Sequence, residues 1–77
     1  MKLGDVLLYR RPYGVQVCRI LSIEQTQIQI EVWRVISRDW HRPHLVSGSA
    51  LDPDSDRLRE EMDRLRAARC APPDIGG

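Results

Sequence analysis

The stretch that decides the fold is Gln27-Ile28-Gln29-Ile30-Glu31-Val32. Polar and apolar residues alternate along it, which is the pattern of a β-strand with one buried face and one polar face. Beyond it, Trp33, Val35 and Ile36 place apolar residues on both faces of the same strand. We therefore expect a strand over residues 27–37, with its far end covered by another element.

Two further strands are expected upstream of this stretch, over residues 5–10 and 15–24. The turn between them is Arg11-Pro12-Tyr13-Gly14, in which proline presets φ and glycine tolerates a positive φ. In the second strand the alternation changes phase near Cys18-Arg19, which predicts a β-bulge there. The polar residues 24–27 form the break of a second hairpin.

Downstream of the stretch the strand pattern weakens. Residues 38–44 are polar and aromatic, and they contain Pro43, which donates no main-chain hydrogen bond. We expect a loop over these residues. A short closing strand over residues 44–47 is expected before Gly48.

A helix is expected over about residues 53–70, where the sequence becomes highly charged. Asp52-Pro53 is a strong start signal, with an N-cap acceptor followed by proline at the first helical position. An apolar stripe recurs at helical spacing: Leu58, Met62, Leu65 and Ala68. Because so narrow a stripe does not stabilise a helix alone, we expect it to dock on the sheet, with self-association as the alternative.

The other faces of this helix carry opposite charges four residues apart. They predict three ion pairs: Arg57–Glu61, Arg59–Asp63 and Glu60–Arg64. Each such pair adds about 0.2–0.5 kcal/mol to the stability of a helix. Pro72-Pro73 then stops the helix.

Together these elements predict a mainly β fold, a small SH3/Tudor-like antiparallel barrel over residues 1–50. One C-terminal α-helix over residues 51–70 is docked on the barrel, and residues 71–77 form a flexible tail. A barrel removes the strand edges that a three-stranded sheet leaves exposed. With 77 residues, the chain is one small domain that buries only about 60% of its unfolded surface, which excludes a multi-domain enzyme.

The charge is nearly balanced overall but is divided along the chain. Twelve basic residues stand against eleven acidic ones, for a net charge of +1. Residues 1–50 hold seven basic and four acidic side chains, whereas residues 51–77 hold five and seven. The basic surplus of the first part is modest beside that of dedicated DNA-binding domains.

The apolar runs and the cysteines bear on the cellular compartment. No run approaches the roughly 18 apolar residues of a membrane-spanning helix, and none has the form of a signal peptide. The two cysteines, Cys18 and Cys70, make no disulfide framework. We expect a cytoplasmic protein with two free thiols and no membrane contact.

Arginines interleaved with aromatic residues are the strongest functional signal. These residue types anchor protein interfaces, and they also contact phosphates and stack on bases. The candidate binding residues are Tyr9, Arg11, Tyr13, Arg34, Arg38, Trp40 and Arg42. The structural alternative is that Trp33 belongs to the core, Trp40 covers one end of the barrel, and the arginines are simply solvated.

No catalytic or metal site is expected. His41 and His44 lie three residues apart, but Cys18 and Cys70 are 52 residues apart and do not complete a zinc-ligand spacing. No nucleophile, base and orienting residue occur together, and no cofactor is implied. The remaining enzyme alternative is a pore shared between several barrels, as in plasmid-type dihydrofolate reductases. The core motif of that family, Val-Gln-Ile-Tyr, is echoed by Ile28-Gln29-Ile30-Glu31 without the tyrosine.

The first half of the chain resembles a known family. The residues that carry the resemblance are Leu3-Gly4-Asp5-Val6-Leu7-Leu8-Tyr9, Tyr13-Gly14-Val15-Gln16-Val17, Ile20 and Ile23-Glu24. They are similar to the opening of the CarD-type RNA-polymerase-interaction domain, also found in transcription-repair coupling factors. KOW-type domains of ribosomal and elongation proteins begin in a similar way.

The resemblance covers about residues 3–36 and implies a bent Tudor-like barrel that pairs with the β subunit of RNA polymerase. The longer insertion between the later strands of that family is missing here. Its separate helical DNA-contacting domain is missing too, and a single helix stands in its place.

These observations lead to one functional hypothesis and two alternatives. We expect a small non-catalytic binding module, a monomer or weak dimer, that recognises a protein of the transcription or translation apparatus, with RNA polymerase as a candidate. The first alternative is direct RNA or DNA binding through the same arginines and aromatic residues. The second is the pore-forming oligomeric enzyme.

Overall fold

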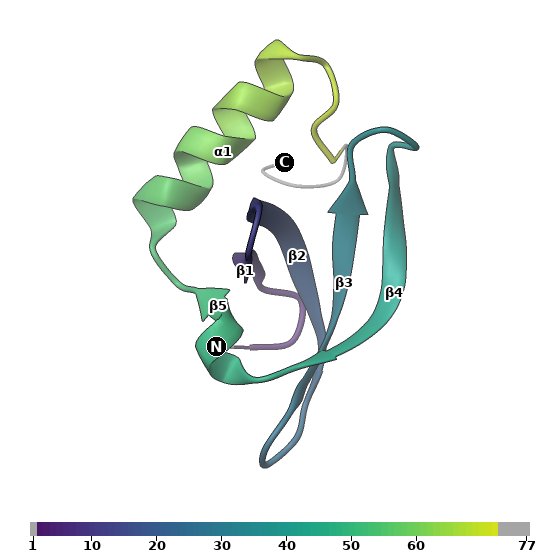
Figure 1. The fold of residues 1–77 in the computed structure, drawn as a ribbon, viewed down its shortest axis with the longest axis vertical. Coiled ribbons are helices and arrows are strands. Elements are labelled where there is room, and N and C mark those ends of the chain that lie inside the picture. The colour runs from purple at the N-terminus through teal and green to yellow at the C-terminus, as the bar shows by residue number, and fades with distance from the viewer. Residues whose placement is uncertain (1, 73–77) are drawn as a thin grey trace.

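The computed structural model describes residues 2–72, and the side chains of all of these except Arg42 and Pro43. Five antiparallel strands form one sheet, and one helix packs on it (Figure 1). The elements are β1 (Val6–Arg11), β2 (Gly14–Ile23), β3 (Ile28–Arg34), β4 (Asp39–Val46), β5 (Leu51–Asp52) and α1 (Ser55–Ala67). The predicted mainly β class with one C-terminal helix is confirmed.

The strand order is β4-β3-β2-β1-β5, so β4 and β5 are the two edges of the sheet. Among the described residues these two strands are not paired with each other, and the sheet is open. Closure into an SH3/Tudor-like barrel therefore stays a prediction. Strand β5 begins at Leu51, so the sheet continues past residue 50 into the segment that was expected to be wholly helical.

The link between the two edge strands forces the sheet to curve. In a flat sheet, four interstrand spacings of about 4.8 Å would separate β4 from β5 by ~19 Å. The chain passes from Val46 to Leu51 through the short 3₁₀ turn η1 (Gly48–Ala50). Even fully extended, these five residue steps span at most ~18 Å, and a 3₁₀ turn rises only about 2 Å per residue. The sheet therefore bends around its inner face.

The inner face holds the larger of two hydrophobic cores. Every strand contributes to it, through Leu7, Tyr9, Cys18, Ile20, Ile28, Ile30, Val32, Val46 and Leu51. The alternation in residues 27–32 is confirmed, because its three apolar members are all buried here.

The outer face is covered by α1. Its core combines residues of the sheet with the apolar stripe of the helix: Leu8, Val17, Trp33, Met62 and Leu65, with Val6, Trp40, Leu58, Cys70 and Ala71 at its margin. The indole Nε1 of Trp33 donates to the main-chain oxygen of Cys70 at 2.6 Å. The middle of the sheet is therefore buried on both sides, which a small domain achieves only by adding a second layer.

Residues 38–44 are not the loop that was expected. They belong almost entirely to β4, which pairs with β3 and also includes the predicted closing strand. The register shifts between the pairs Ile30↔His44 and Val32↔His41, so β4 holds one extra residue there. Pro43 lies in this irregular part of an edge strand, where a missing N–H breaks no ladder.

The predicted bulge near Cys18-Arg19 is wrong in position. The register of β2 against β3 shifts between Ile20 and Ser22 instead. No bulge is needed at Arg19, because Glu31 lies directly opposite on β3 and forms an ion pair with it on the helix-covered side. A charged residue on a buried face is tolerated when its partner faces it.

The prediction for the end of β3 is also wrong. The strand ends at Arg34, three residues earlier than expected. Trp33 is covered by α1, but Val35 and Ile36 lie in the following turn and are exposed.

Helix α1 begins two residues later than expected. Its N-cap is Asp54, whose carboxylate accepts from the main-chain N–H groups of Asp56 and Arg57. Asp52, the predicted cap, belongs to β5 and pairs with Leu8 of β1. Both Asp52 and Asp54 precede the apolar stripe of the helix, so either could serve as its N-cap in the sequence. Because Asp52 pairs with the edge of β1, Asp54 becomes the cap.

The helix ends at Ala67 in a Schellman arrangement. Arg69 takes a positive φ of 58°, the N–H of Cys70 donates to the oxygen of Leu65 at 2.9 Å, and that of Arg69 donates to Arg66 at 3.0 Å. This reversal brings Cys70 and Ala71 back onto the outer core, and Pro72 is buried as well. The expected tail therefore does not begin at residue 71, and residues 73–77 lie outside the described part.

The ion pairs of α1 differ from those expected. Among the described residues they join side chains three positions apart rather than four: Asp54–Arg57, Asp56–Arg59, Glu61–Arg64 and Asp63–Arg66. The arginines of these pairs are exposed, so each pair adds little to the stability of the fold.

Candidate functional site

Two turns meet at one end of the sheet. The β1–β2 turn and the β3–β4 turn both lie opposite the long β2–β3 hairpin (Figure 1). In the first turn Arg11 pairs with Gly14, whose φ of 140° is a value that favours glycine. The two residues between them place Tyr13 at the tip, with its side chain 98% exposed.

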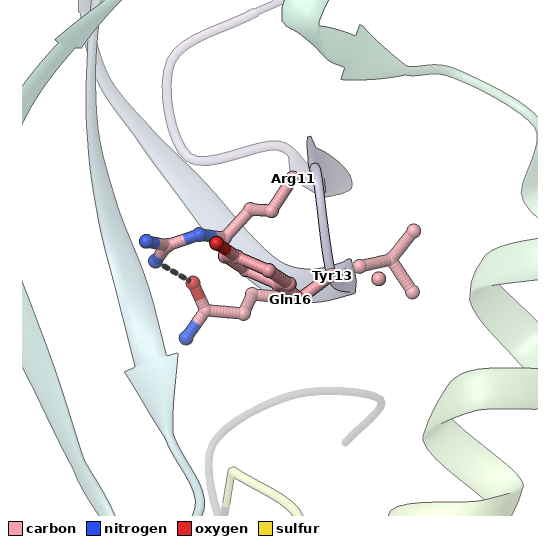
Figure 2. Close-up of a pocket in the computed structure, with 5 residues that line it drawn as sticks. Arg11, Tyr13 and Gln16 are labelled. Atoms are coloured by element: carbon pink, nitrogen blue, oxygen red, sulfur yellow. Dashed lines mark hydrogen bonds between the residues drawn. The ribbon is translucent and has the colours of Figure 1, made fainter.

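Arg11 is held by neutral neighbours. Its Nη1 donates to Oε1 of Gln16 at 2.6 Å (Figure 2). Its guanidinium carbon also lies 5.8 Å from the ring centroid of Tyr9. Tyr9 itself packs against the inner core. Among the described residues no carboxylate forms an ion pair with Arg11, so its charge is not neutralised.

Arg34 and Asp39, which flank the β3–β4 turn, form a bidentate ion pair. Arg34 Nε donates to Oδ1 of Asp39 at 2.9 Å and Nη2 donates to Oδ2 at 2.8 Å, while Ser37 Oγ donates to Oδ1 at 2.6 Å. The hydrogen bond from Arg34, followed by that from Ser37, lowers the pKa of Asp39 to about 2. Arg34 therefore fixes the turn.

The same turn exposes Arg38, Val35 and Ile36. Arg38 has a positive φ of 56°, and its main-chain N–H donates to the oxygen of Arg34 at 2.8 Å. Within the described part of the chain its guanidinium has no ion-pair partner. Ile36 is 96% exposed, and Val35 beside it is exposed as well.

Two hollows adjoin one another between these turns. One, of about 270 Å³, is lined by Arg11, Tyr13, Gly14, Val15 and Gln16 (Figure 2). The other, of about 410 Å³, is lined by Gln16, Arg34, Val35, Ile36 and Ser37. Gln16 is common to both. We call the region the two-hairpin surface; it consists of Arg11, Tyr13, Val15, Gln16, Arg34, Val35, Ile36 and Arg38.

Trp40 serves the outer core. Its ring packs edge-on against Trp33, with centroids 5.3 Å apart and planes at 68°. The guanidinium carbon of Arg19 lies 4.5 Å from the ring centroid of Trp40, and Arg19 is also paired with Glu31. These contacts agree with the structural alternative for Trp33, which belongs to the core, whereas Trp40 packs at the margin of the outer core and is not shown to cover the end of a barrel.

His41 and His44 form a second polar group on β4. Their ring centroids are 5.1 Å apart, and Nε2 of His44 is buried without a hydrogen-bond partner among the described residues. Burial, followed by the charges of His41 and Arg11, lowers the pKa of His44. Within residues 2–72, no three histidine, cysteine or acidic side chains are grouped as metal ligands.

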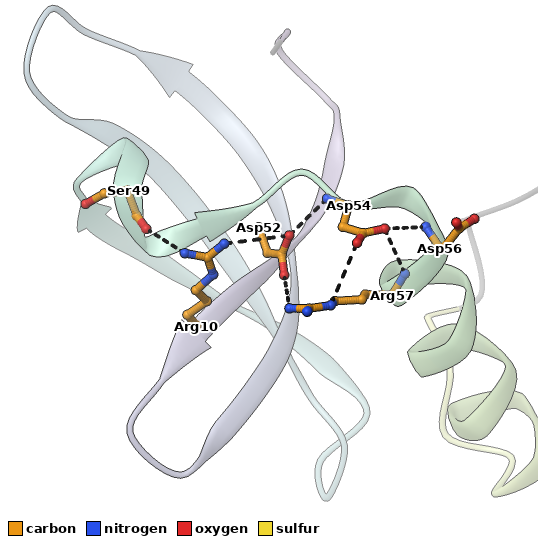
Figure 3. A network of polar contacts seen from close by, with 6 residues as sticks. All are labelled: Arg10, Ser49, Asp52, Asp54, Asp56 and Arg57. Carbon is orange, nitrogen blue, oxygen red and sulfur yellow. Dashed lines mark hydrogen bonds and ion pairs between the residues drawn. The ribbon is translucent and has the colours of Figure 1, made fainter.

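A third polar group joins the sheet to the helix (Figure 3). Asp52, only 5% exposed, accepts from the main-chain N–H of Asp54 at 3.0 Å and from Nη1 of Arg57 at 3.3 Å. Arg10 Nη2 lies 3.8 Å from Oδ1, the oxygen that also accepts from Asp54, and Arg10 Nη1 donates to the main-chain oxygen of Ser49 at 3.5 Å. Its carboxylate is fully engaged by protein groups, so we assign it a structural role.

The structure brings only part of the predicted site together. Arg11, Tyr13 and Arg34 line the two hollows, and Arg38 lies in the turn that forms the second one, whereas Tyr9 and Trp40 pack against the two cores, and the side chain of Arg42 lies outside the described part. Sequence reasoning missed Val15, Gln16, Val35 and Ile36. The last two carried a signal, because apolar residues on both faces just before a polar break also fit an exposed turn.

The chain was compared with family models, curated proteins and solved structures, and nothing matches it. The described part of the chain contains no helix with both the length and the apolar character that spanning a membrane requires.

Proposed function

We propose that the chain is a small non-catalytic module that binds another protein through the two-hairpin surface. The observation that carries the proposal is the nearly complete exposure of Tyr13 and Ile36, 98% and 96%, at the rims of two adjoining hollows. Apolar side chains that are exposed together on one surface mark interaction sites, whereas single ones do not, and tyrosine and arginine are enriched among interface hot spots.

The charges of the surface favour a protein over a nucleic acid. Most of the arginines are already paired with carboxylates: Arg10, Arg19, Arg34, Arg57, Arg59, Arg64 and Arg66. On the two-hairpin surface, Arg11 and Arg38 are the two described arginines without an ion-pair partner. Nucleic-acid binding draws its affinity from many unpaired cations along the phosphate backbone, which this surface does not offer.

The resemblance of residues 3–36 to CarD-type domains supports a cytoplasmic component of the transcription or translation apparatus as the partner. RNA polymerase is the first component to test. The hollows, at about 270 and 410 Å³, lie just below and in the lower part of the roughly 300–1,000 Å³ range of small-molecule pockets, and both suit single side chains of a partner.

Photo-crosslinking in cells tests this proposal. A photoreactive amino acid replaces Ile36 in one variant and Gln25, in the turn at the opposite end of the sheet, in a matched control. We expect a nuclease-resistant crosslink to one or a few defined proteins from position 36 and none of these from position 25. Equal crosslinking from both positions, or none from position 36, would contradict the proposal.

Direct nucleic-acid binding is the second candidate, since Arg11 and Arg38 have no ion-pair partner among the described residues and Arg11 lines the same hollow as Tyr13. It predicts a rise in the fluorescence anisotropy of labelled RNA or DNA that falls steeply with added salt. An unchanged anisotropy at high protein concentration and low salt removes this candidate.

A further inference from the structure

Gln16 lies between the two hollows and has one hydrogen-bonding group to spare. Because a guanidinium only donates, the atom that accepts from Arg11 is the amide oxygen, which leaves the Nε2 group as the remaining donor. Figure 2 shows this nitrogen on the side of the amide that faces away from Arg11. Among the described residues nothing accepts from it. A ligand that crosses Gln16 therefore meets a donor that is suited to a carbonyl oxygen.

Each hollow has an apolar wall and belongs to a turn that carries an arginine without an ion-pair partner among the described residues. Tyr13 and Val15 line one hollow beside Arg11, whereas Val35 and Ile36 line the other, in the turn that also carries Arg38. The single carboxylate in that turn, Asp39, is taken up by Arg34 and Ser37. The described two-hairpin surface thus has two apolar positions and two uncompensated positive charges.

We infer that the partner docks through an acidic segment of a protein that carries two apolar side chains, one for each hollow. Carboxylates of this segment pair with Arg11 and Arg38, and a main-chain carbonyl between the two apolar residues accepts from Gln16 Nε2. Charge complementarity selects this occupant, because a basic or neutral segment would leave both arginines without a counter-charge. The inference rests on the proposed function and specifies the chemistry of its partner.

A displayed library of random linear peptides, selected on the full chain, provides the probe. We expect the enriched peptides to be rich in Asp and Glu and to share two apolar positions. For the best peptide, synthesised and labelled, affinity should fall about tenfold or more in Arg38→Glu and in Gln16→Glu. The second change keeps a partner for Arg11 but removes the amide donor and adds a repelling charge.

Matched controls carry the same changes of charge elsewhere. Arg59→Glu on the exposed face of α1 and Gln25→Glu in the β2–β3 turn should each alter affinity less than about twofold. Thermal unfolding of every variant shows that the fold is retained. Weaker binding at higher salt is expected because the paired charges are at the surface.

Any of three results with peptides overturns the inference: enrichment of basic or uncharged peptides, failure to select any peptide, or equal affinity of the Arg38→Glu and Arg59→Glu variants. Binding of labelled RNA or DNA, lost in Arg38→Glu while no acidic peptide binds, also overturns it. The crosslinking experiment does not depend on peptide chemistry. A crosslink from position 36 together with a failed selection would leave the proposed function standing and remove only this inference.

Discussion

Asp52 is the carboxylate on which the strand edge and the helix converge. Its Oδ1 accepts from the N–H of Asp54 at 3.0 Å, and Arg57 and Arg10 approach the two oxygens at 3.3 and 3.8 Å. The hydrogen bond from Asp54, then the charges of Arg10 and Arg57, lower the pKa of Asp52 below its ordinary value, although burial opposes this. The ionised form is therefore the one that the fold stabilises.

This gives a prediction for Asp52→Asn. Because the folded pKa of Asp52 is depressed, its contribution to stability is complete above the unfolded pKa, about 3.9, and is lost as the pH falls through the lower folded pKa. Urea unfolding should show the variant less stable than the wild type at pH 7, with the difference narrowing below about pH 4. Asp56→Asn, on the exposed helix start, is the control and should change stability little. A difference that persists undiminished at pH 2 would show that the ionised carboxylate is not what matters.

At the scale of the element, α1 is held by two buried residues and one at the margin. Met62 and Leu65 are buried in the outer core, whereas Leu58 is only half-buried. The Schellman reversal after Ala67 then carries Cys70 back to the indole of Trp33. The helix is therefore attached most firmly at its C-terminal half.

Two leucine truncations distinguish this arrangement from a helix that is an interface between copies. Leu65→Ala should lower the free energy of unfolding by about 2–5 kcal/mol, and Leu58→Ala by clearly less, because less apolar surface is buried there. Chemical denaturation measures both, and sedimentation gives the oligomeric state. Equal effects, or a dimer that becomes a monomer without loss of stability, would contradict the docked helix.

The elements show where sequence reasoning works and where it stops. The alternation in residues 27–32 and the 3.6-residue stripe of α1 are local patterns that record a buried face, and both predicted their elements correctly. Strand β4 escaped detection because an edge strand with a register shift accommodates Pro43 and needs little alternation. The predicted helix start is wrong by two residues because Asp52 and Asp54 are equally good N-caps in the sequence. Only the pairing of Asp52 with Leu8 of β1 distinguishes them.

At the scale of the whole molecule, burial on both faces of the sheet places Cys18 at the centre. Its side chain is 0% exposed, and burial raises the pKa of its thiol to about 12, so the nucleophilic thiolate is absent near neutral pH. Cys70 lies at the margin of the outer core and is half-buried. Modification of Cys18 therefore requires the core to unfold, whereas modification of Cys70 requires only a local opening at the margin of the outer core.

A disulfide reagent such as DTNB should separate them. In the native protein at pH 8, Cys70 should react first, and Cys18 should react slowly, at a rate set by global unfolding. Absorbance kinetics give both phases, and urea should merge them. Cys70→Ser should leave only the slow phase and Cys18→Ser only the fast one. A native Cys18 that reacts as fast as Cys70 would show that the inner core is open to solvent.

The candidate site also depends on the tertiary structure of the whole molecule, and for this reason the sequence predicted only half of its residues. The abundance of arginine and aromatic residues predicted a binding surface of this kind, but assigning Tyr9 and Trp40 to the cores requires knowing both faces of the sheet. Gln16 becomes notable only because two turns, more than 20 residues apart in the chain, meet beside it. A local sequence pattern cannot predict that these two turns lie together in the fold.

The short strand β5 makes the last third of the chain inseparable from the first. Leu51 packs in the inner core, and its neighbour Asp52 forms an ion pair with Arg57 of α1. Two adjacent residues therefore connect the two layers of the molecule. A chain cut after residue 50 would bare the edge of β1, remove a wall of the inner core and uncover Trp33 in a single step. The boundary that the sequence predicts between residues 50 and 51 is therefore not a place to divide the protein. In hydrogen exchange the amides of β5 and α1 should open together as one cooperative unit.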